Sequence, residues 1–255
     1  MPLFRAEILA YRDLYPASAE IRIVSSGSAE GMEQLVNGEV AMAVLTRELT
    51  DPEVQAAVSR AGLNVFPVAW DAVAVIVHPT CPVAQISRTE LAEIYLGAVT
   101  QWSALGWKNG GTIHPLTTDP RHGLYEFIQQ ALLDGGSYAP GVYAQAGEDE
   151  IVRVVAERPG AIGLASRALV SDRVRTLRVS AAQGLPSTEL SRETLMTRTY
   201  PLLRSVSVCT PKDPASTASE FVTFVSSLDG QGIVARHGYA PATVPVRIVR
   251  TTEEE

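Results

Sequence analysis

Several features that define large functional classes are scarce or absent in this sequence. No apolar run approaches the roughly 20 residues that span a bilayer. The chain begins without a basic stretch followed by an apolar one, so we expect a soluble chain without an export signal. Lysine and arginine number 21 against 28 aspartate and glutamate, and the basic residues are scattered along the chain. This distribution disfavours nucleic acid and anionic membrane surfaces as partners.

Cysteine is rare, and the common catalytic motifs are missing. Cys81 and Cys209 lie far apart and fit either a disulfide or two buried thiols, of which the thiols are favoured. There is no Walker loop, no zinc-spaced set of cysteine and histidine, and no Gly-x-Ser-x-Gly nucleophile elbow. The dinucleotide-like pattern at 230–235 follows a helical segment rather than a strand, which favours a chance match. The sequence therefore predicts no enzyme, no metal site and no cofactor.

An α/β architecture follows from the order of the apolar segments. With 46% hydrophobic and 19% charged residues in 255, the chain can bury a substantial core in one large domain or two lobes. Short apolar runs of the kind found in buried parallel strands alternate with segments of helical spacing. The predicted strands are 21–24, 40–45, 65–68, 72–77, 161–165, 174–179 and 205–209, and helices are predicted around 89–96, 124–132, 151–155 and 221–228.

Two helix starts carry local signals. Ser87 and Glu90 have the spacing of a capping box, and Gly97 can end that helix. The acids at 148–150 precede the apolar positions of another helix, where negative charge suits the positive end of the helix dipole. We interpret them as helix-start residues rather than as a catalytic pair.

The segment 25–31 is the most informative loop. It follows the predicted strand 21–24 and enters a helical pattern, so its serines and free backbone N–H groups point at one place. Such a place attracts an anion. The alternative is that Ser28 only caps the helix, as serine often does.

The chain resembles the phosphate-binding solute receptors of the Pst-type ABC transporters. The matching segments occur in the family's order at 27–31, 46–49, 71–79, 91–105, 159–163, 200–204 and 221–241. The resemblance implies a type II periplasmic-binding fold, in which two α/β lobes joined by two crossover strands close over a ligand. The expected lobes are 1–72 with 205–255, and 73–204, with crossovers near Asp71 and Arg204.

The resemblance also implies an oxyanion site. Its contacts would come from Ser26, Gly27 and Ser28 in the loop, from Thr46 and Arg47 after the next strand, and from the segment that contains Thr118, Arg121, His122 and Gly123. Asp71 would lie in the cleft floor, either facing the ligand and accepting its proton or bonded to backbone at the hinge, the hinge role being favoured.

This chain departs from the family pattern at the fourth contact segment. Thr118 stands where the family has arginine, His122 where it has serine and Leu124 where it has threonine, whereas Gly123 is retained. Arg121 can supply a displaced guanidinium or be an exposed helix-start residue, and His122 can donate to an anion or lie on the surface. The sequence begins where the family enters its first helix, so we expect one contact loop fewer and weaker phosphate binding.

The predicted function is therefore non-enzymatic capture of phosphate or a similar oxyanion for an ABC importer. The resemblance implies a transporter permease as partner and a periplasmic or extracytoplasmic location. The alternative is a sensory or interaction module on the same fold that does not bind phosphate tightly. An enzyme on this fold, such as a phosphate-ester hydrolase, lacks an identifiable nucleophile.

Overall fold

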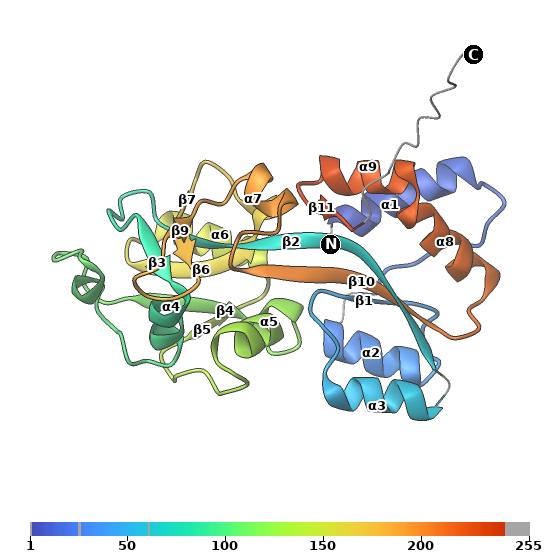
Figure 1. Ribbon diagram of the computed structural model, residues 1–255, viewed down its shortest axis with the longest axis horizontal. Coiled ribbons are helices and arrows are strands. Elements are labelled where there is room, and N and C mark those ends of the chain that lie inside the picture. Colours follow the sequence, from blue (N-terminus) through green and yellow to red (C-terminus); the bar gives the residue numbers. More distant parts are fainter. Residues whose placement is uncertain (1, 25–26, 61, 243–255) are drawn as a thin grey trace, which may run out of the picture.

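The computed structural model describes residues 2–24, 27–60 and 62–242, and it forms two α/β halves joined by long antiparallel strands (Figure 1). The helices are α1 (Pro2–Leu14), α2 (Ser28–Val36), α3 (Asp51–Arg60), α4 (Arg88–Tyr95), α5 (Gly123–Leu132), α6 (Glu148–Glu157), α7 (Arg192–Met196), α8 (Ser216–Ser226) and α9 (Leu228–Arg236), with short 3-10 helices η1 (Trp102–Leu105) and η2 (Arg167–Leu169). The strands are β1 (Ala43–Leu45), β2 (Leu63–Val77), β3 (Gln85–Ser87), β4 (His114–Thr118), β5 (Tyr143–Gln145), β6 (Ala161–Ser166), β7 (Arg175–Thr176), β8 (Arg178–Ser180), β9 (Ser187–Thr188), β10 (Leu203–Pro211) and β11 (Ala240–Pro241). The predicted α/β class is confirmed.

Strands β2 and β10 connect the two halves. The main sheet has the order β1-β10-β2-β6-β4-β5. The first part of β2 pairs with β10, with Ala72 opposite Leu203 and Asp71 opposite Arg204. From Val73 onward β2 pairs with β6 instead. Because β2 changes partners between Ala72 and Val73, the pair of Asp71 and Arg204 lies next to the point where the chain passes from one half to the other.

The direction of several strands differs from the prediction. The apolar runs indicate parallel strands, but β1, β2, β10 and β6 pair antiparallel. In the described part of the chain, parallel pairing joins β4 to β5 and β6, and β3 to β8. Residues 73–77 of β2 are fully buried whatever the strand direction, because packed side chains cover both faces of the sheet. Continuous burial thus produced the pattern that suggested parallel strands.

The half that contains both ends of the described chain, called lobe I here, has three layers. Strands β1 and β10 lie between α1, α8 and α9 on one face and α2 and α3 on the other (Figure 1). Successive side chains of β1 point to opposite faces. Val44 packs with the cluster of α1, α8 and α9, whereas Ala43 and Leu45 pack with Met32 and Leu35 of α2.

The other half, lobe II, is built around the buried end of β2 and helices α4, α5 and α6. At the start of α4 the capping box is confirmed: the Ser87 hydroxyl accepts from the Glu90 N–H at 3.1 Å, and Glu90 accepts from the Ser87 N–H at 2.8 Å. Gly97, with φ of 77°, follows the helix in the left-handed conformation that glycine adopts without strain.

The hydrophobic clusters divide near the expected lobe boundaries. One cluster runs from Ala72 to Leu202 and adds Ala240, and a second joins residues of α1, α8 and α9 to β2 and β10. These clusters are consistent with lobes of 1–72 with 205–255 and of 73–204. The exact boundaries stay a prediction, and residues 243–255 lie outside the described part.

Two predicted strands are wrong in detail. Residues 21–24 form no strand, and Val24 is 68% exposed. A run of apolar residues becomes a strand only where another strand pairs with its backbone, and residues 21–24 appear in none of the described ladders. The predicted strand 174–179 divides into β7 and β8, which pair with different partners.

The expectation of thiols is confirmed, since Cys81 and Cys209 are free and buried.

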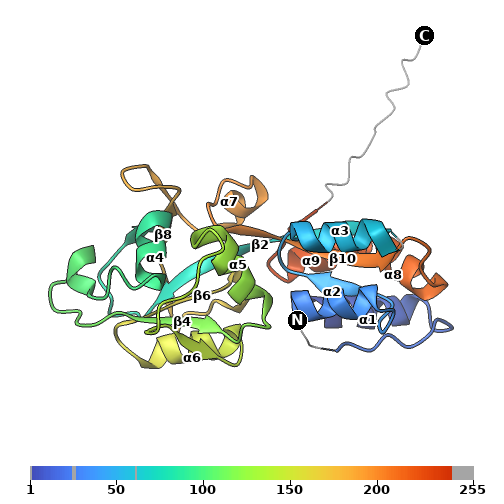
Figure 2. The ribbon, with the colours of Figure 1, turned by 90° about the horizontal axis from the view of Figure 1, so that it is seen from below.

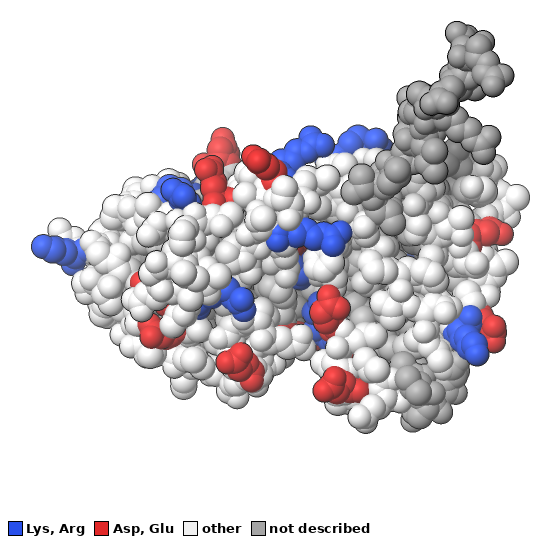
Figure 3. Space-filling model, viewed as in Figure 1, with Lys and Arg blue, Asp and Glu red and all other residues white. Residues whose placement is uncertain are grey.

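Neither a membrane-spanning helix nor a metal cluster occurs in the described residues. Across 2–24, 27–60 and 62–242, every helix is too short or too polar to cross a bilayer. The same ranges hold no group of three or more histidine, cysteine, aspartate or glutamate side chains placed to bind a metal ion. On the face shown in Figure 3, acidic and basic side chains are interspersed.

Glu7 of α1 makes the stability of the fold depend on pH. It is 0% exposed, and neither carboxylate oxygen has a hydrogen-bond partner in the described structure. Burial raises the pKa of Glu7 to about 8, although the charge of Arg236 opposes the shift. The folded chain therefore holds a proton that the unfolded chain releases above its ordinary pKa, so stability falls as the pH rises from about 5 to about 8.

We predict that Glu7→Gln removes this pH dependence, because the amide cannot ionise. Urea unfolding should show the unmodified chain losing roughly 2–4 kcal/mol between pH 5 and pH 8, and the variant much less. Glu33→Gln, at an exposed position of α2, is the matched control and should behave like the unmodified chain. Equal pH slopes for Glu7→Gln and the unmodified chain would contradict the assignment.

Candidate functional site

The first residues of α2 and α5 meet at the junction between the lobes (Figure 2). Gly27, with φ of 93°, lies so close to the Arg121 carbonyl that a Cβ on it would fall 1.4 Å from that oxygen. A Cβ on Gly123 would lie 2.1 Å from Thr46 Oγ1 and 2.9 Å from Ser28 Oγ. Only glycine fits at either position. Two helix N-termini, each with the positive end of a helix dipole, therefore approach the same place.

Ser28 does not cap α2, so that alternative is wrong. The N-cap residue is Gly27, and Ser28 is the first residue of the helix. The Ser28 side chain is buried, and its Oγ accepts a hydrogen bond from the Thr46 N–H at 3.2 Å. This contact links the loop before α2 to the end of β1. Ser26, also expected at the site, lies outside the described residues.

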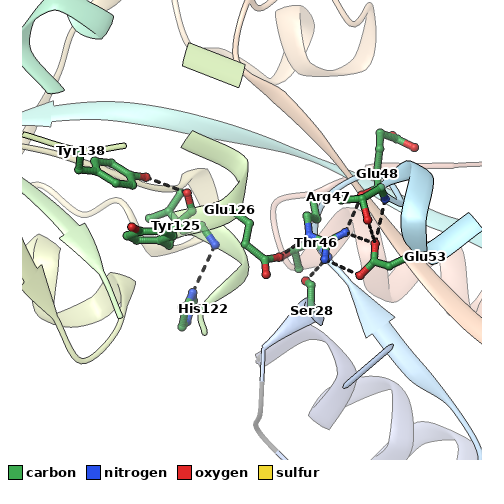
Figure 4. Close-up of polar contacts among 11 residues, drawn as sticks. Ser28, Thr46, Arg47, Glu48, Glu53, His122, Tyr125, Glu126 and Tyr138 are labelled. Atoms are coloured by element: carbon green, nitrogen blue, oxygen red, sulfur yellow. Dashed lines mark hydrogen bonds and ion pairs between the residues drawn. The ribbon is translucent and has the colours of Figure 1, made fainter. Parts of the chain in front are cut away.

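Arg47 joins the lobes instead of facing an open site. Its guanidinium bonds to both oxygens of Glu53 at 2.8 Å, and its Nε contacts Glu126 of α5 in lobe II (Figure 4). Burial lowers the pKa of Arg47, but the two carboxylates outweigh it and raise the pKa above the ordinary value. Since two acids already hold this side chain, its expected contact with an anion remains an untested prediction.

A buried charge network fills the point where β2 and β10 cross between the lobes. Asp71 Oδ2 accepts from Arg204 Nε at 2.9 Å, and Asp71 Oδ1 accepts from the Ser166 hydroxyl at 2.8 Å. Glu148, at the start of α6, accepts from Arg204 Nη2 at 2.9 Å and from the Ser166 N–H at 2.6 Å. The hydrogen bonds of Asp71 thus go to side chains, so the favoured expectation of an acid bonded to backbone is wrong.

The two acids of this network differ in proton affinity. For Asp71, burial raises the pKa, and the opposing effect of Arg204 does not cancel it. For Glu148, burial also acts to raise the pKa, but Arg204 and the Ser166 N–H outweigh it, and the pKa is lowered. Asp71 is therefore the acid that takes up a proton more readily.

Two buried polar atoms beside this network have no hydrogen-bond partner in the described structure. They are Nη1 of Arg204, whose residue is 4% exposed, and Oγ1 of Thr118, whose residue is 0% exposed. Thr118 is the last residue of β4, next to the strand that ends in Ser166. Leaving such atoms unpaired costs about 1–3 kcal/mol each. Each atom can donate a hydrogen bond to an oxyanion, because guanidinium and hydroxyl groups are donors.

His122 lies between the two parts of the site. It is the N-cap of α5, and its Nδ1 accepts from the Leu124 N–H at 3.5 Å. Burial lowers the pKa of His122, and the charges of Glu148 and Arg204 also act on the ring. A neutral ring with Nδ1 as acceptor carries its proton on Nε2, which leaves one donor for a ligand.

Arg121 is not brought to this group. Its side chain is 74% exposed, and its Nε bonds to Asp119 at 2.9 Å. The structure gathers Gly27, Ser28, Thr46 and Gly123, with His122 at the start of the same helix as Gly123, and it places Asp71 at the crossover. Thr118 lies at the end of β4 in lobe II. Three members of the network were not predicted from the sequence: Glu148, Ser166 and the side chain of Arg204. The position of Arg204 opposite Asp71 at the expected crossover was the one available signal.

The comparisons with known proteins agree with the resemblance noted in the sequence. A family model described as the PBP superfamily domain matches residues 1–228. The phosphate-binding protein PstS of Pseudomonas aeruginosa is 26% identical over 262 residues, covering 96% of this chain and 80% of the relative. The PstS of Bacillus subtilis is 28% identical, covering 88% and 72%. The chain belongs to the PBP superfamily domain family, and the resemblance predicted from the sequence is confirmed.

Solved structures show the same fold. A putative phosphate ABC transporter substrate-binding protein from Clostridium perfringens, with bound phosphate, aligns with a TM-score of 0.83 at 24% identity and covers 95% of each chain. An ABC-type phosphate transport receptor from Vibrio cholerae aligns with a TM-score of 0.79 at 22% identity, covering 94% of this chain and 95% of that one. The two-lobe α/β architecture is thus confirmed.

We predict that the contact between Arg47 and Glu126 holds the lobes together. Glu126→Gln keeps the side-chain shape but removes the charge, so the ligand-free chain should populate a more open form. Small-angle X-ray scattering should report a larger radius of gyration than for the unmodified chain. Glu150→Gln is the matched control, because it breaks an exposed ion pair with Arg153 within α6. Identical scattering from Glu126→Gln and the unmodified chain would refute this role.

Proposed function

We propose that this protein is a receptor that captures phosphate or a similar oxyanion between its lobes and releases it to an ABC importer. Binding and release make and break no covalent bond. The single observation that carries the proposal is the buried guanidinium of Arg204, whose Nη1 has no partner in the described structure, at the strand crossover between two lobes. The names of the relatives, which are phosphate-binding proteins, support the same ligand class.

Four kinds of donor surround the proposed site. The N-termini of α2 and α5 supply backbone N–H groups, Ser28 and Thr46 supply hydroxyls, and His122 supplies a ring N–H. Arg204 at the crossover and Thr118 at the end of β4 supply the two unpartnered groups. Helix dipoles and one guanidinium can hold an anion in a chain whose net charge is −7, because they act locally and out of water.

The acids of the network favour an oxyanion that carries a proton. A fully ionised anion such as sulfate offers no donor to Asp71 or Glu148, whereas a protonated phosphate does. We therefore expect phosphate to be preferred to sulfate.

The expected affinity is modest. At the α5 contact segment Thr118, His122 and Leu124 replace an arginine, a serine and a threonine of the family pattern, a loss worth roughly 3–5 kcal/mol. Arg204 offsets part of this loss. The partner would be the permease of an ABC transporter, and the receptor would act in the periplasm or another extracytoplasmic space.

Calorimetric titration with phosphate tests the proposal. We predict binding in roughly the micromolar to submillimolar range, and weaker or undetectable binding of sulfate. Thr118→Val keeps the side-chain shape and removes only the hydroxyl, so phosphate affinity should fall about 5- to 20-fold while the fold is retained. Arg121→Ala should change the affinity little, because its guanidinium is exposed and bonded to Asp119.

Thr223→Val, on the exposed side of α8, is the matched control and should bind like the unmodified chain. No heat of binding at 10 mM phosphate would reject the receptor and favour the alternative of an interaction module on the same fold. If Arg121→Ala abolished phosphate binding and Thr118→Val left it intact, the site would instead lie at Arg121, just before the start of α5.

A further inference from the structure

A pocket lies between the lobes, and it shares no lining residue with the proposed phosphate site. Its volume is about 560 Å³. Lobe II contributes η2 and the segments around Thr176 and Leu190, and lobe I contributes the end of α9. Small-molecule sites in proteins commonly have volumes of 300–1,000 Å³, so this pocket has room for a ligand well beyond the size of inorganic phosphate.

The ionisable residues that line this pocket are all arginine or histidine. They are Arg167, Arg236 and His237, and no acid lines it although acids outnumber bases in the chain. In the described part of the protein, neither guanidinium takes part in an ion pair with a carboxylate. Arg167 Nη1 donates to the Gly238 carbonyl at 3.1 Å, and its other N–H groups are free for a ligand. Arg236 also acts electrostatically on the Glu7 carboxyl. Two guanidinium groups in one pocket, with no carboxylate within ion-pair distance among the described residues, attract an anionic group.

Apolar side chains form a smaller part of the pocket surface. Val170 and Leu190 form part of the wall, and Thr176 adds a hydroxyl. Val170 and Leu190 are partly buried and pack against the core of lobe II, so they form a firm surface. A small inorganic anion would leave this wall uncovered. A ligand with a carboxylate at one end and a ring or short hydrocarbon part at the other would use both features.

We propose that this pocket binds a small organic acid, with its carboxylate groups at Arg167 and Arg236 and its apolar part against Val170 and Leu190. The proposal holds whether or not the other site binds phosphate.

The pocket also has a structural connection to the crossover network. Ser166 Oγ donates to Asp71 at 2.8 Å and accepts from the N–H of Ala168 at 3.2 Å, and Ala168 lines the pocket. The hydrogen bond from Arg167 to Gly238 spans the two lobes. A ligand that contacts Arg167 and Arg236 touches both lobes and so binds differently to open and closed forms. By linkage, it should change the affinity of the other site, and phosphate should change its affinity in return.

Phthalate and benzoate are suitable probes, because each combines carboxylate with an aromatic ring and phthalate has two carboxylates for two arginines. Calorimetric titration of the full chain should show phthalate binding, with benzoate weaker. Arg236→Ala should weaken phthalate binding tenfold or more, and since this side chain is exposed the variant should fold normally. Arg12→Ala removes an equally exposed arginine near the end of α1 and serves as the matched control.

No binding of phthalate at 10 mM, or equal binding by Arg236→Ala and the unmodified chain, would overturn the proposal. Phosphate titration of Arg236→Ala separates the two sites. Lost phthalate binding with retained phosphate binding by this variant supports two separate sites. Failure of the unmodified chain to bind phosphate, with phthalate binding present, would count against the receptor and not against this pocket.

Discussion

The buried ion pair between Arg204 and Asp71 is the interaction on which the rest of the structure depends. Both residues are almost fully buried, and they stand opposite each other where β2 and β10 cross between the lobes. Removing charges from water is costly unless each finds partners. Glu148 and Ser166 provide them, so one guanidinium fixes the ends of α6 and β6 relative to both crossover strands.

A network of this kind positions a binding site more than it stabilises the fold. Buried ion pairs often contribute little net stability compared with apolar side chains of the same size. Arg204 donates from Nε to Asp71 and from Nη2 to Glu148. Its Nη1 has no hydrogen-bond partner in the described structure. The lobes are joined nearby by Arg47 and Glu126, so binding and closure depend on neighbouring groups. A binding group and a contact between the lobes are expected to be neighbours where a ligand shifts the hinge equilibrium by contacting both lobes.

Local sequence signals predicted much of the fold, and long-range contacts explain what they missed. The capping box at Ser87 and the helix of Leu124 and Phe127 depend on residues three or four positions apart, so the sequence contains them directly. The isolated run 21–24 and the direction of β2 depend on which strands pair, which no local pattern records. The role of Glu148 was missed for a related reason: its spacing fits a helix start, and its partner Arg204 is 56 residues away.

At the candidate site, too, the residues with local sequence signals were predicted and those placed by long-range strand pairing were not. Gly27, Ser28, Thr46 and Gly123 were predicted together and lie together, because each follows a recognisable strand or starts a helix. The expected guanidinium did not follow the family pattern, and the nearest candidate along the chain, Arg121, points to Asp119 instead. The buried guanidinium comes from β10, at a position that only the strand register reveals.

A crystal structure of the chain grown with phosphate tests the central claim most directly. We predict an anion between the lobes, within hydrogen-bond distance of Arg204 Nη1 and Thr118 Oγ1 and close to the starts of α2 and α5. An anion held by the Arg121 side chain, with Arg204 and Thr118 still unpaired, would contradict it.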